Sequence, residues 1–81
     1  MGKEDDIAAL RKLGNVIREL RKKKGLSQEQ LGFLSGLDRS YVGGIERGER
    51  NLSFSNLLRV SDALGVSLLV VFQDFDKERQ K

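Results

Sequence analysis

The stretch from Ser27 to Gly48 constrains the fold most, because it predicts two short helices joined at a glycine. Ser27 and Gln30 have the spacing of a capping box, in which each side chain accepts a hydrogen bond from the other residue's backbone N–H. Gly36 stands where a helix end commonly needs a positive φ. Asp38 is a suitable N-cap for a second helix of about nine or ten residues that ends at Gly48. The stretch therefore predicts a helix, a sharp turn and a second helix.

Each of these two helices is expected to bury one face. Leu31 and Leu34 lie three residues apart in the first helix and are predicted to point inward. At 100° per residue, Val42 and Ile45 share the inward face of the second helix. The outward face of that helix combines Ser40, Gly43, Gly44 and Arg47, with Arg39 and Tyr41 on its flanks.

The outward face has the residue types that suit a helix lying in the DNA major groove. Arginine can bond to guanine with two N–H groups, serine can donate or accept, and glycine lets the backbone come close. Two helices joined by a short turn form the helix-turn-helix arrangement of many DNA-binding proteins. Base contacts are predicted for Arg39 and Ser40, and Gly43 and Gly44 are predicted to allow close approach. The alternative for each glycine is a position under no packing demand.

The residues RxxxGLSQExL…LDRSYVxxIERGERN…L…ALG resemble the lambda-repressor-like helix-turn-helix family of phage repressors and Cro, also described as XRE-type. The likeness covers about residues 17–66 and is greatest to the small controller proteins of restriction-modification systems. It implies an all-α, compact bundle of five short helices. It also implies a homodimer on a palindromic operator, regulating its own gene and a linked endonuclease gene. Contact with RNA polymerase is a further option.

The resemblance also assigns roles to several residues outside the second helix. It implies an ion pair between Arg21 and Glu46, with direct contact of Arg21 to DNA as the alternative. Gln28 and Asn51 would lie on phosphates, and Arg50 on a phosphate or on a base near the operator centre. Gly32 departs from the family pattern, which usually has alanine, and a mid-helix glycine costs about 1 kcal/mol relative to alanine. No compensating reason for Gly32 is evident in the sequence.

Two further backbone contacts are expected from position and chemistry. Ser27 and Gln28 stand at the start of a helix, where unpaired N–H groups and the positive dipole end favour a phosphate. The ring and hydroxyl of Tyr41 are suited to a phosphate or a thymine methyl, with packing as the alternative.

For Arg47 and Arg50, the alternative to a contact with DNA is an ion pair with Glu46 and Glu49.

A longer helix is predicted before this stretch and another after it. Asp5 or Asp6 is expected to cap the first helix, which ends at Gly25. Its buried face is predicted to comprise Ile7, Leu10, Leu13 or Gly14, Ile17 and Leu20. Ser53 is expected to cap a helix over residues 54–64 that Gly65 ends. Its buried face is predicted to comprise Leu57, Val60 or Ser61, and Leu64.

The residues from Val66 to Phe72 form a dense apolar run that only Ser67 interrupts. A helix capped by Ser67 is favoured, but the β-branched and aromatic content also permits a strand. The run is too apolar for a small monomer to hide, which suggests a dimer interface through Leu68, Leu69 and Phe72. The alternative is that the whole run packs on the core. The tail beyond Phe75 is expected to fray.

Composition narrows the functional class. The 81 residues predict one domain, 1–81, with its core at about 6–72 and a tail at 73–81. The chain lacks cysteine and histidine, and no cofactor, metal or enzyme activity is expected. No signal peptide or membrane span is recognised, so the expected compartment is the cytoplasm. The net charge is +3, and the stretch from Arg11 to Lys24 contains seven Lys or Arg against one acid, which favours a polyanionic partner.

The hypothesis that these observations favour is a sequence-specific, DNA-binding transcriptional regulator. The competing class is a protein-binding module, antitoxin-like or adaptor-like, that uses the helix-turn-helix as a scaffold and residues 66–72 for its partner. Salt dependence distinguishes the two, because phosphate contacts weaken steeply as salt rises and apolar contacts barely respond.

Overall fold

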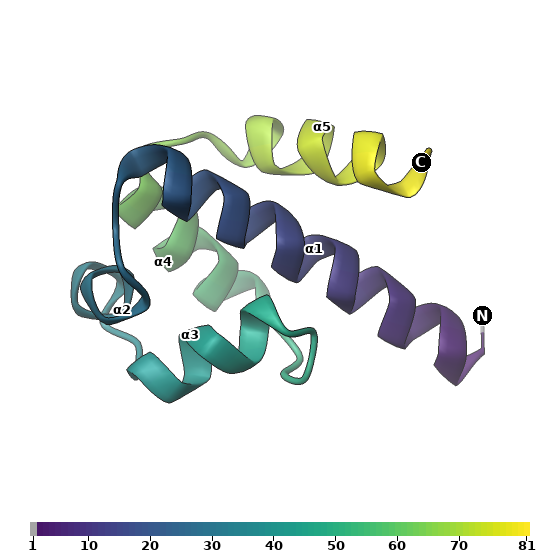
Figure 1. Ribbon diagram of the computed structural model, residues 1–81, viewed down its shortest axis with the longest axis horizontal. Coiled ribbons are helices and arrows are strands. Elements are labelled where there is room, and N and C mark those ends of the chain that lie inside the picture. The colour runs from purple at the N-terminus through teal and green to yellow at the C-terminus, as the bar shows by residue number, and fades with distance from the viewer. Residues whose placement is uncertain (1) are drawn as a thin grey trace.

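Five helices and their connecting turns make up the computed structural model, which describes residues 2–81 with the side chain of Lys3 excepted. The helices are α1 (Lys3–Lys24), α2 (Gln28–Ser35), α3 (Arg39–Glu46), α4 (Phe54–Leu64) and α5 (Leu68–Arg79), and the described residues contain no strand. The long α1 lies in the middle of the bundle. It packs against α5 on one side and against α3 on another (Figure 1). The predicted all-α bundle is confirmed.

Most helix ends follow the capping rules that the sequence contains. The hydroxyls of Ser27, Ser53 and Ser67 accept hydrogen bonds from the backbone N–H three residues later, at 3.0, 3.2 and 3.3 Å. Gln30 returns the bond to the Ser27 N–H at 2.8 Å, which completes the predicted capping box. Gly36 adopts a φ of 72° at the sharp turn between α2 and α3.

The start of α1 differs from the prediction. The helix begins at Lys3 with Gly2 at the N-cap position, so the assignment of Asp5 or Asp6 as the cap is wrong. The Asp5 carboxylate instead accepts a hydrogen bond from the Gly2 N–H at 3.3 Å. Ile7 is exposed, contrary to prediction, because the first turns of α1 project beyond the rest of the bundle (Figure 1).

The core contains residues from all five helices. Its buried hydrophobic members are Val16, Ile17, Leu20, Leu31, Val42, Ile45, Leu57, Val60, Leu64 and Val71. The prediction for Leu34 is wrong, since that side chain is 54% exposed. Ser35, one turn after Leu31, takes the inward position. Its hydroxyl donates to the Leu31 carbonyl oxygen at 2.7 Å, which makes a polar side chain acceptable in the core.

Two glycines allow backbones to approach closely inside the bundle. A Cβ at Gly14 of α1 would overlap the carbonyl oxygen of Ile45 and lie 2.8 Å from that of Glu46. A Cβ at Gly32 of α2 would lie 2.7 Å from the carbonyl oxygen of Leu37 in the turn. Gly32 therefore has the structural reason that the sequence did not reveal, because the turn into α3 crosses α2 where a methyl group would stand.

The C-terminal segment is helical over a longer stretch than predicted. The apolar run after Ser67 is helical, and α5 continues through Arg79, so a tail frayed beyond Phe75 is wrong. Val71 is buried against the core, and Asn15 of α1 donates its amide N–H to Glu78 at 3.2 Å. Among the described residues, no single helix is long and apolar enough to cross a membrane.

Candidate nucleic-acid interface

The inward and outward faces of α3 are arranged as predicted for Val42, Ile45, Arg39 and Ser40. Val42 and Ile45 are buried, which fixes the helix against the core. Arg39 and Ser40 are exposed at the start of the helix. The helix begins at Arg39, three residues after the sharp turn at Gly36. It ends at Glu46, two residues before the predicted end at Gly48.

The polar groups at the start of α3 interact with near neighbours. Asp38 occupies the N-cap position, but its carboxylate makes no capping hydrogen bond and accepts instead from the Ser40 hydroxyl at 2.6 Å. The Arg39 guanidinium lies 3.5 Å from the Glu29 carboxylate, and both side chains remain largely exposed. Such an exposed pair is worth only about 0 to 1 kcal/mol, so it leaves Arg39 free to turn toward a ligand.

Gly43 and Gly44 are buried, so the prediction that they lie open on the outward face is wrong. Long polar side chains cover them. A Cβ at Gly43 would lie 3.1 Å from the Arg47 guanidinium and 3.4 Å from the Gln28 amide oxygen. A Cβ at Gly44 would lie 2.6 Å from Cγ of Arg50. Close approach of DNA to these glycines stays a prediction, and it requires those side chains to move.

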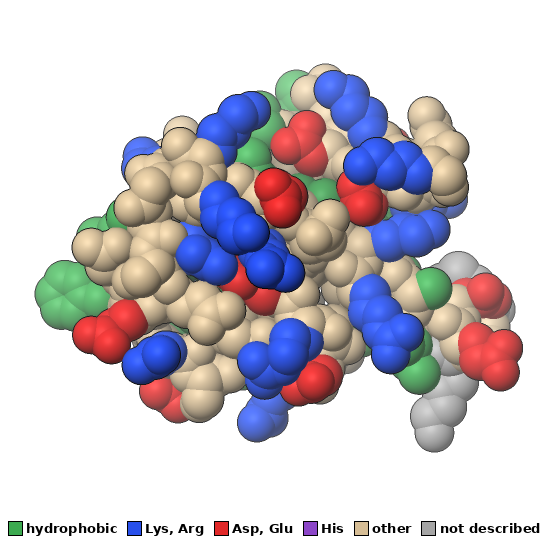
Figure 2. All heavy atoms as spheres, in the orientation of Figure 1, with side chains coloured by type: hydrophobic (Ala, Val, Ile, Leu, Met, Phe, Trp, Pro, Cys, Tyr) green, Lys and Arg blue, Asp and Glu red, His purple; other side chains and the backbone are tan. Residues whose placement is uncertain are grey.

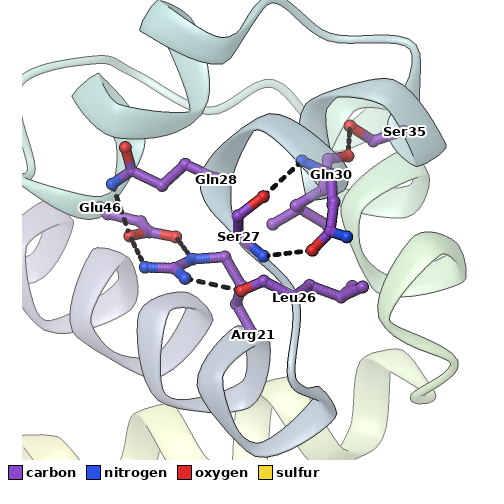
Figure 3. A network of polar contacts seen from close by, with 8 residues as sticks. Arg21, Leu26, Ser27, Gln28, Gln30, Ser35 and Glu46 are labelled. Carbon is purple, nitrogen blue, oxygen red and sulfur yellow. Dashed lines mark hydrogen bonds and ion pairs between the residues drawn. The ribbon is translucent and has the colours of Figure 1, made fainter.

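A buried ion pair joins α1 to the end of α3, as the resemblance implied. Arg21 donates to both carboxylate oxygens of Glu46, at 2.7 and 3.0 Å, and to the Leu26 carbonyl oxygen at 2.8 Å (Figure 3). The two side chains are only 12% and 2% exposed. The hydrogen bonds that Arg21 donates to Glu46 raise the pKa of Arg21, although burial opposes the increase. Direct contact of Arg21 with DNA is the less suitable role for a side chain held in this way.

Gln28 belongs to the same network, which the sequence did not predict. Its amide nitrogen donates to Glu46 at 3.0 Å, so one carboxylate holds residues from both α1 and α2 (Figure 3). The bond uses one of the two amide N–H groups and leaves the other for a further acceptor. A phosphate contact by Gln28 stays a prediction. The two residues are 18 positions apart, so no local pattern in the sequence predicts their bond.

Tyr41 links α3 to the following loop and to α4. Its hydroxyl donates to the Asn51 carbonyl oxygen at 3.0 Å and accepts from the Asn56 amide at 3.1 Å. The ring also packs against the core as a half-buried side chain. These contacts support the packing alternative for Tyr41, and they identify Asn56 as a supporting residue that the sequence did not predict.

The loop after α3 carries charged side chains with different partners. Arg47 pairs with Glu49 at 3.0 Å, with side chains 59% and 61% exposed. Neither arginine of the loop pairs with Glu46, because Arg21 already occupies that carboxylate. Arg50 and Asn51 are exposed, and Arg50 forms no ion pair with any described residue.

The structure brings several of the predicted contact residues to one place. A polar hollow of about 560 Å³ lies between the start of α2 and Arg39. Its lining comprises Arg21, Ser27, Gln28, Glu29, Gln30 and Arg39. Figure 2 shows Lys and Arg side chains spread over this view of the molecule with Asp and Glu side chains between them. The exposed Lys22, Lys23 and Lys24 end α1.

Comparison with known proteins places the chain in a family. A helix-turn-helix family model matches residues 17–71. Control protein C.MunI from Mycoplasma sp is 44% identical over 68 residues, which are 83% of this chain and 92% of that protein. The crystal structure of the controller protein C.AhdI from Aeromonas hydrophila matches at 58% identity and a TM-score of 0.78, covering 79% of this chain and 97% of that one.

A third match includes DNA. The structure of the controller protein C.Esp1396I as a tetramer in complex with its natural 35 base-pair operator matches at 42% identity and a TM-score of 0.85. The match covers 90% of this chain and 96% of that one. The chain belongs to the helix-turn-helix family and, within it, to the group of restriction-modification controller proteins.

Proposed function

We propose that this protein is a sequence-specific DNA-binding transcriptional regulator, which acts as a homodimer on a palindromic operator. As a controller protein, it would regulate its own gene and a linked endonuclease gene. It would work in the cytoplasm, in contact with RNA polymerase where it activates. The relative C.Esp1396I, a tetramer on its 35 base-pair operator, supports an assembly of more than one protomer on DNA.

The observation that carries the proposal is the arrangement of α3. Val42 and Ile45 fix its inward face in the core, while Arg39 and Ser40 stand exposed at its first turn. In this position α3 can enter a major groove with its N-terminal residues toward the base edges. Arg39, Ser40 and Arg50 are proposed to read bases, because their side chains are exposed and end in hydrogen-bonding groups. The ion pair of Arg39 with Glu29 is exposed as well, so it holds the guanidinium only weakly.

Contacts to the DNA backbone would set the register of α3 in the groove. Ser27 and Gln28 lie at the start of α2, whose first N–H groups can meet a phosphate. Gln28 has one N–H left after its bond to Glu46. Asn51 has an exposed side chain on the loop, and Tyr41 anchors the backbone of that residue. Tyr41 would therefore act chiefly by holding Asn51, with its own phosphate contact as a further proposal.

The exposed apolar face of α5 is proposed to join two protomers. Val71 is buried in the protomer, whereas Leu69 is 64% exposed and Phe72 is exposed beside it. Leu68, half-buried at the start of the helix, would complete the patch. A two-fold interface through these residues would place two copies of α3 in half-sites about one helical turn, roughly 10 bp, apart.

The dimer has its own test, the substitution Leu69→Glu. A carboxylate in the middle of an apolar two-fold interface would face its own copy, so the variant is expected to be monomeric. Analytical ultracentrifugation measures this directly, and circular dichroism controls for folding. An unchanged sedimentation coefficient in a folded variant would exclude the interface.

Selection of bound sequences from a random DNA pool tests the proposal as a whole. The expected result is a palindromic consensus with two half-sites, because a two-fold dimer reads the same bases twice. Enrichment of a site without symmetry would contradict the dimer. No enrichment at all would contradict sequence-specific binding.

A second candidate function has one observation in its favour. Phe33 is 87% exposed on α2 and, with Leu34, borders a hollow of about 400 Å³ that is separate from the α5 face. Such an apolar patch suits an antitoxin-like or adaptor-like protein-binding module. The salt dependence of binding separates the two functions: operator affinity should fall steeply between 50 and 200 mM salt, by about 1000-fold for six phosphate contacts.

A further inference from the structure

The backbone on both sides of the loop residue Arg50 is fixed by hydrogen bonds to α3. The backbone on its N-terminal side is fixed to α3, because the Glu49 N–H donates to the Gly44 carbonyl oxygen at 2.9 Å. The backbone on its C-terminal side is fixed as well, because the Tyr41 hydroxyl donates to the Asn51 carbonyl oxygen at 3.0 Å. With the loop anchored on both sides, the direction of Arg50 depends on its side-chain torsions.

Gly44 lies directly under the Arg50 side chain. A Cβ at Gly44 would lie 2.6 Å from Cγ, 3.6 Å from Cδ and 3.5 Å from Nε of Arg50. The aliphatic part of Arg50 therefore crosses α3 in the space that any other residue at position 44 would fill. Gly44 is one helical turn after Ser40, so both residues lie on the same face of α3. The Arg50 side chain itself remains exposed, and it forms no ion pair with the described residues.

We infer that Gly44 is a positioning residue for DNA recognition: the absence of its side chain creates a slot that directs Arg50 across the outward face of α3. The inference rests on the proposed base contact of Arg50. It also explains why a helix of eight residues keeps a glycine there, against the preference for better helix formers. A methyl group at this position forces Arg50 into another χ1 rotamer, because Cγ is too close to the backbone to adjust by small shifts.

The test is a double-mutant cycle with Gly44→Ala and Arg50→Ala, measured as affinity for the selected operator and for random DNA. Each single variant is expected to lose about tenfold in operator affinity, within the range for one arginine–base contact. In the Arg50→Ala background, Gly44→Ala is expected to cause no further loss, because there is no longer a side chain to direct. A merely structural role would lower the melting temperature, whereas Gly44→Ala should leave it equal or raise it.

The outcomes separate the inference from the proposed function. If Gly44→Ala lowers operator affinity tenfold in the Arg50→Ala background as well, the methyl group contacts DNA directly. This result would contradict the inference that Gly44 directs Arg50. An Arg50→Ala variant that binds like the wild type would overturn it too, while leaving the other contacts standing. A wild-type protein that does not distinguish operator from random DNA would instead contradict the proposed function.

A second measurement does not depend on DNA or on a variant that must fold. In the free wild-type protein, nuclear Overhauser effects are expected between the Hα protons of Gly44 and the Hγ protons of Arg50, since the two groups are in contact. Their absence under conditions where other contacts of α3 are seen would overturn the inference.

Discussion

The two sides of α3 carry neighbouring charged residues that are held in opposite ways. On the inner side, Glu46 is nearly enclosed and accepts three hydrogen bonds from Arg21 and Gln28. On the outer side, the next residue, Arg47, makes one hydrogen bond to Glu49, and both side chains are more than half exposed. The charge of Glu46 is therefore buried in an ion pair that joins two helices, whereas the charge of the adjacent Arg47 faces solvent.

The glycines of the bundle repeat this contrast. Gly14 faces backbone carbonyl oxygens of α3, which cannot move without moving the helix. Gly43 and Gly44 on the outer side are covered by arginine and glutamine side chains, which can rotate. The inner side of α3 is therefore fixed by buried groups and backbone, whereas the outer side is covered by groups that are able to rearrange. This is the division that a reading helix needs, with its position fixed and its contacts adaptable.

The largest effect on stability is expected from Glu46→Ala. The substitution leaves the nearly buried Arg21 guanidinium without its carboxylate, and an uncompensated charge of this kind costs about 3 kcal/mol or more. Urea unfolding followed by circular dichroism measures the change. The matched control is Glu49→Ala, whose pair is exposed and whose unfolding free energy should change by less than about 1 kcal/mol. Equal losses in the two variants would break the contrast between the two sides.

Gly14→Ala is expected to destabilise the fold by about 2 kcal/mol. Overpacking against a rigid neighbour costs about 1 to 3 kcal/mol or more, and the higher helix propensity of alanine returns about 1 kcal/mol. The methyl group would meet two carbonyl oxygens of α3, so α1 and α3 must separate. The same unfolding assay applies, with Gly44→Ala as the comparison. Equal unfolding free energies for the two alanine variants would contradict the difference between the inner side of α3, which packs against backbone, and the outer side, which is covered by side chains.

Arg39→Ala should change recognition while leaving the fold unchanged. Its ion pair with Glu29 is exposed, so removing the Arg39 side chain should hardly alter the free energy of unfolding. Discrimination between the operator and random DNA should fall by about 1 to 3 kcal/mol, and random-sequence binding should remain nearly the same. Fluorescence anisotropy with both DNAs checks this. An equal loss on all sequences would assign Arg39 to the phosphates.

The smallest effect is expected from Arg47→Ala, measured as unfolding free energy. Its pair with Glu49 is exposed and screened, so the change should stay below about 1 kcal/mol. Repeating the measurement in high salt gives the control, because a screened pair loses what little it contributes. A decrease of about 3 kcal/mol in the unfolding free energy would show that the charges on the outer side of α3 contribute as much to stability as a buried ion pair.

The sequence was sufficient to predict the elements whose signals are local. The serines that begin α2, α4 and α5 and the glycines that follow α1, α2 and α4 specify those boundaries through hydrogen bonds and φ angles within a few residues. The buried face of α3 also follows from its own periodicity. These features depend on the chain near each residue and hardly on the rest of the bundle.

The features that the sequence did not predict depend on distant contacts. Leu34 appears inward by spacing, but the packing of α2 against α3 and α4 buries the neighbouring Ser35 instead. The need for Gly32 arises only where the turn at Leu37 crosses α2. The cover over Gly43 and Gly44 comes from side chains of other segments. Of the candidate site, exposure of Arg39 and Ser40 and the Arg21–Glu46 pair were foreseen, whereas the Gln28 bond was not.

The place of α1 between α3 and α5 has a consequence for the spacing of an operator. The same continuous helix contacts the proposed reading helix, α3, at Gly14 and the proposed dimer helix, α5, at Asn15. Two protomers joined through α5 would therefore present their reading helices at one fixed separation, with no flexible linker to lengthen or shorten it. Operators with base pairs inserted between their half-sites would have to twist or bend to engage both protomers, and otherwise only one half would be occupied.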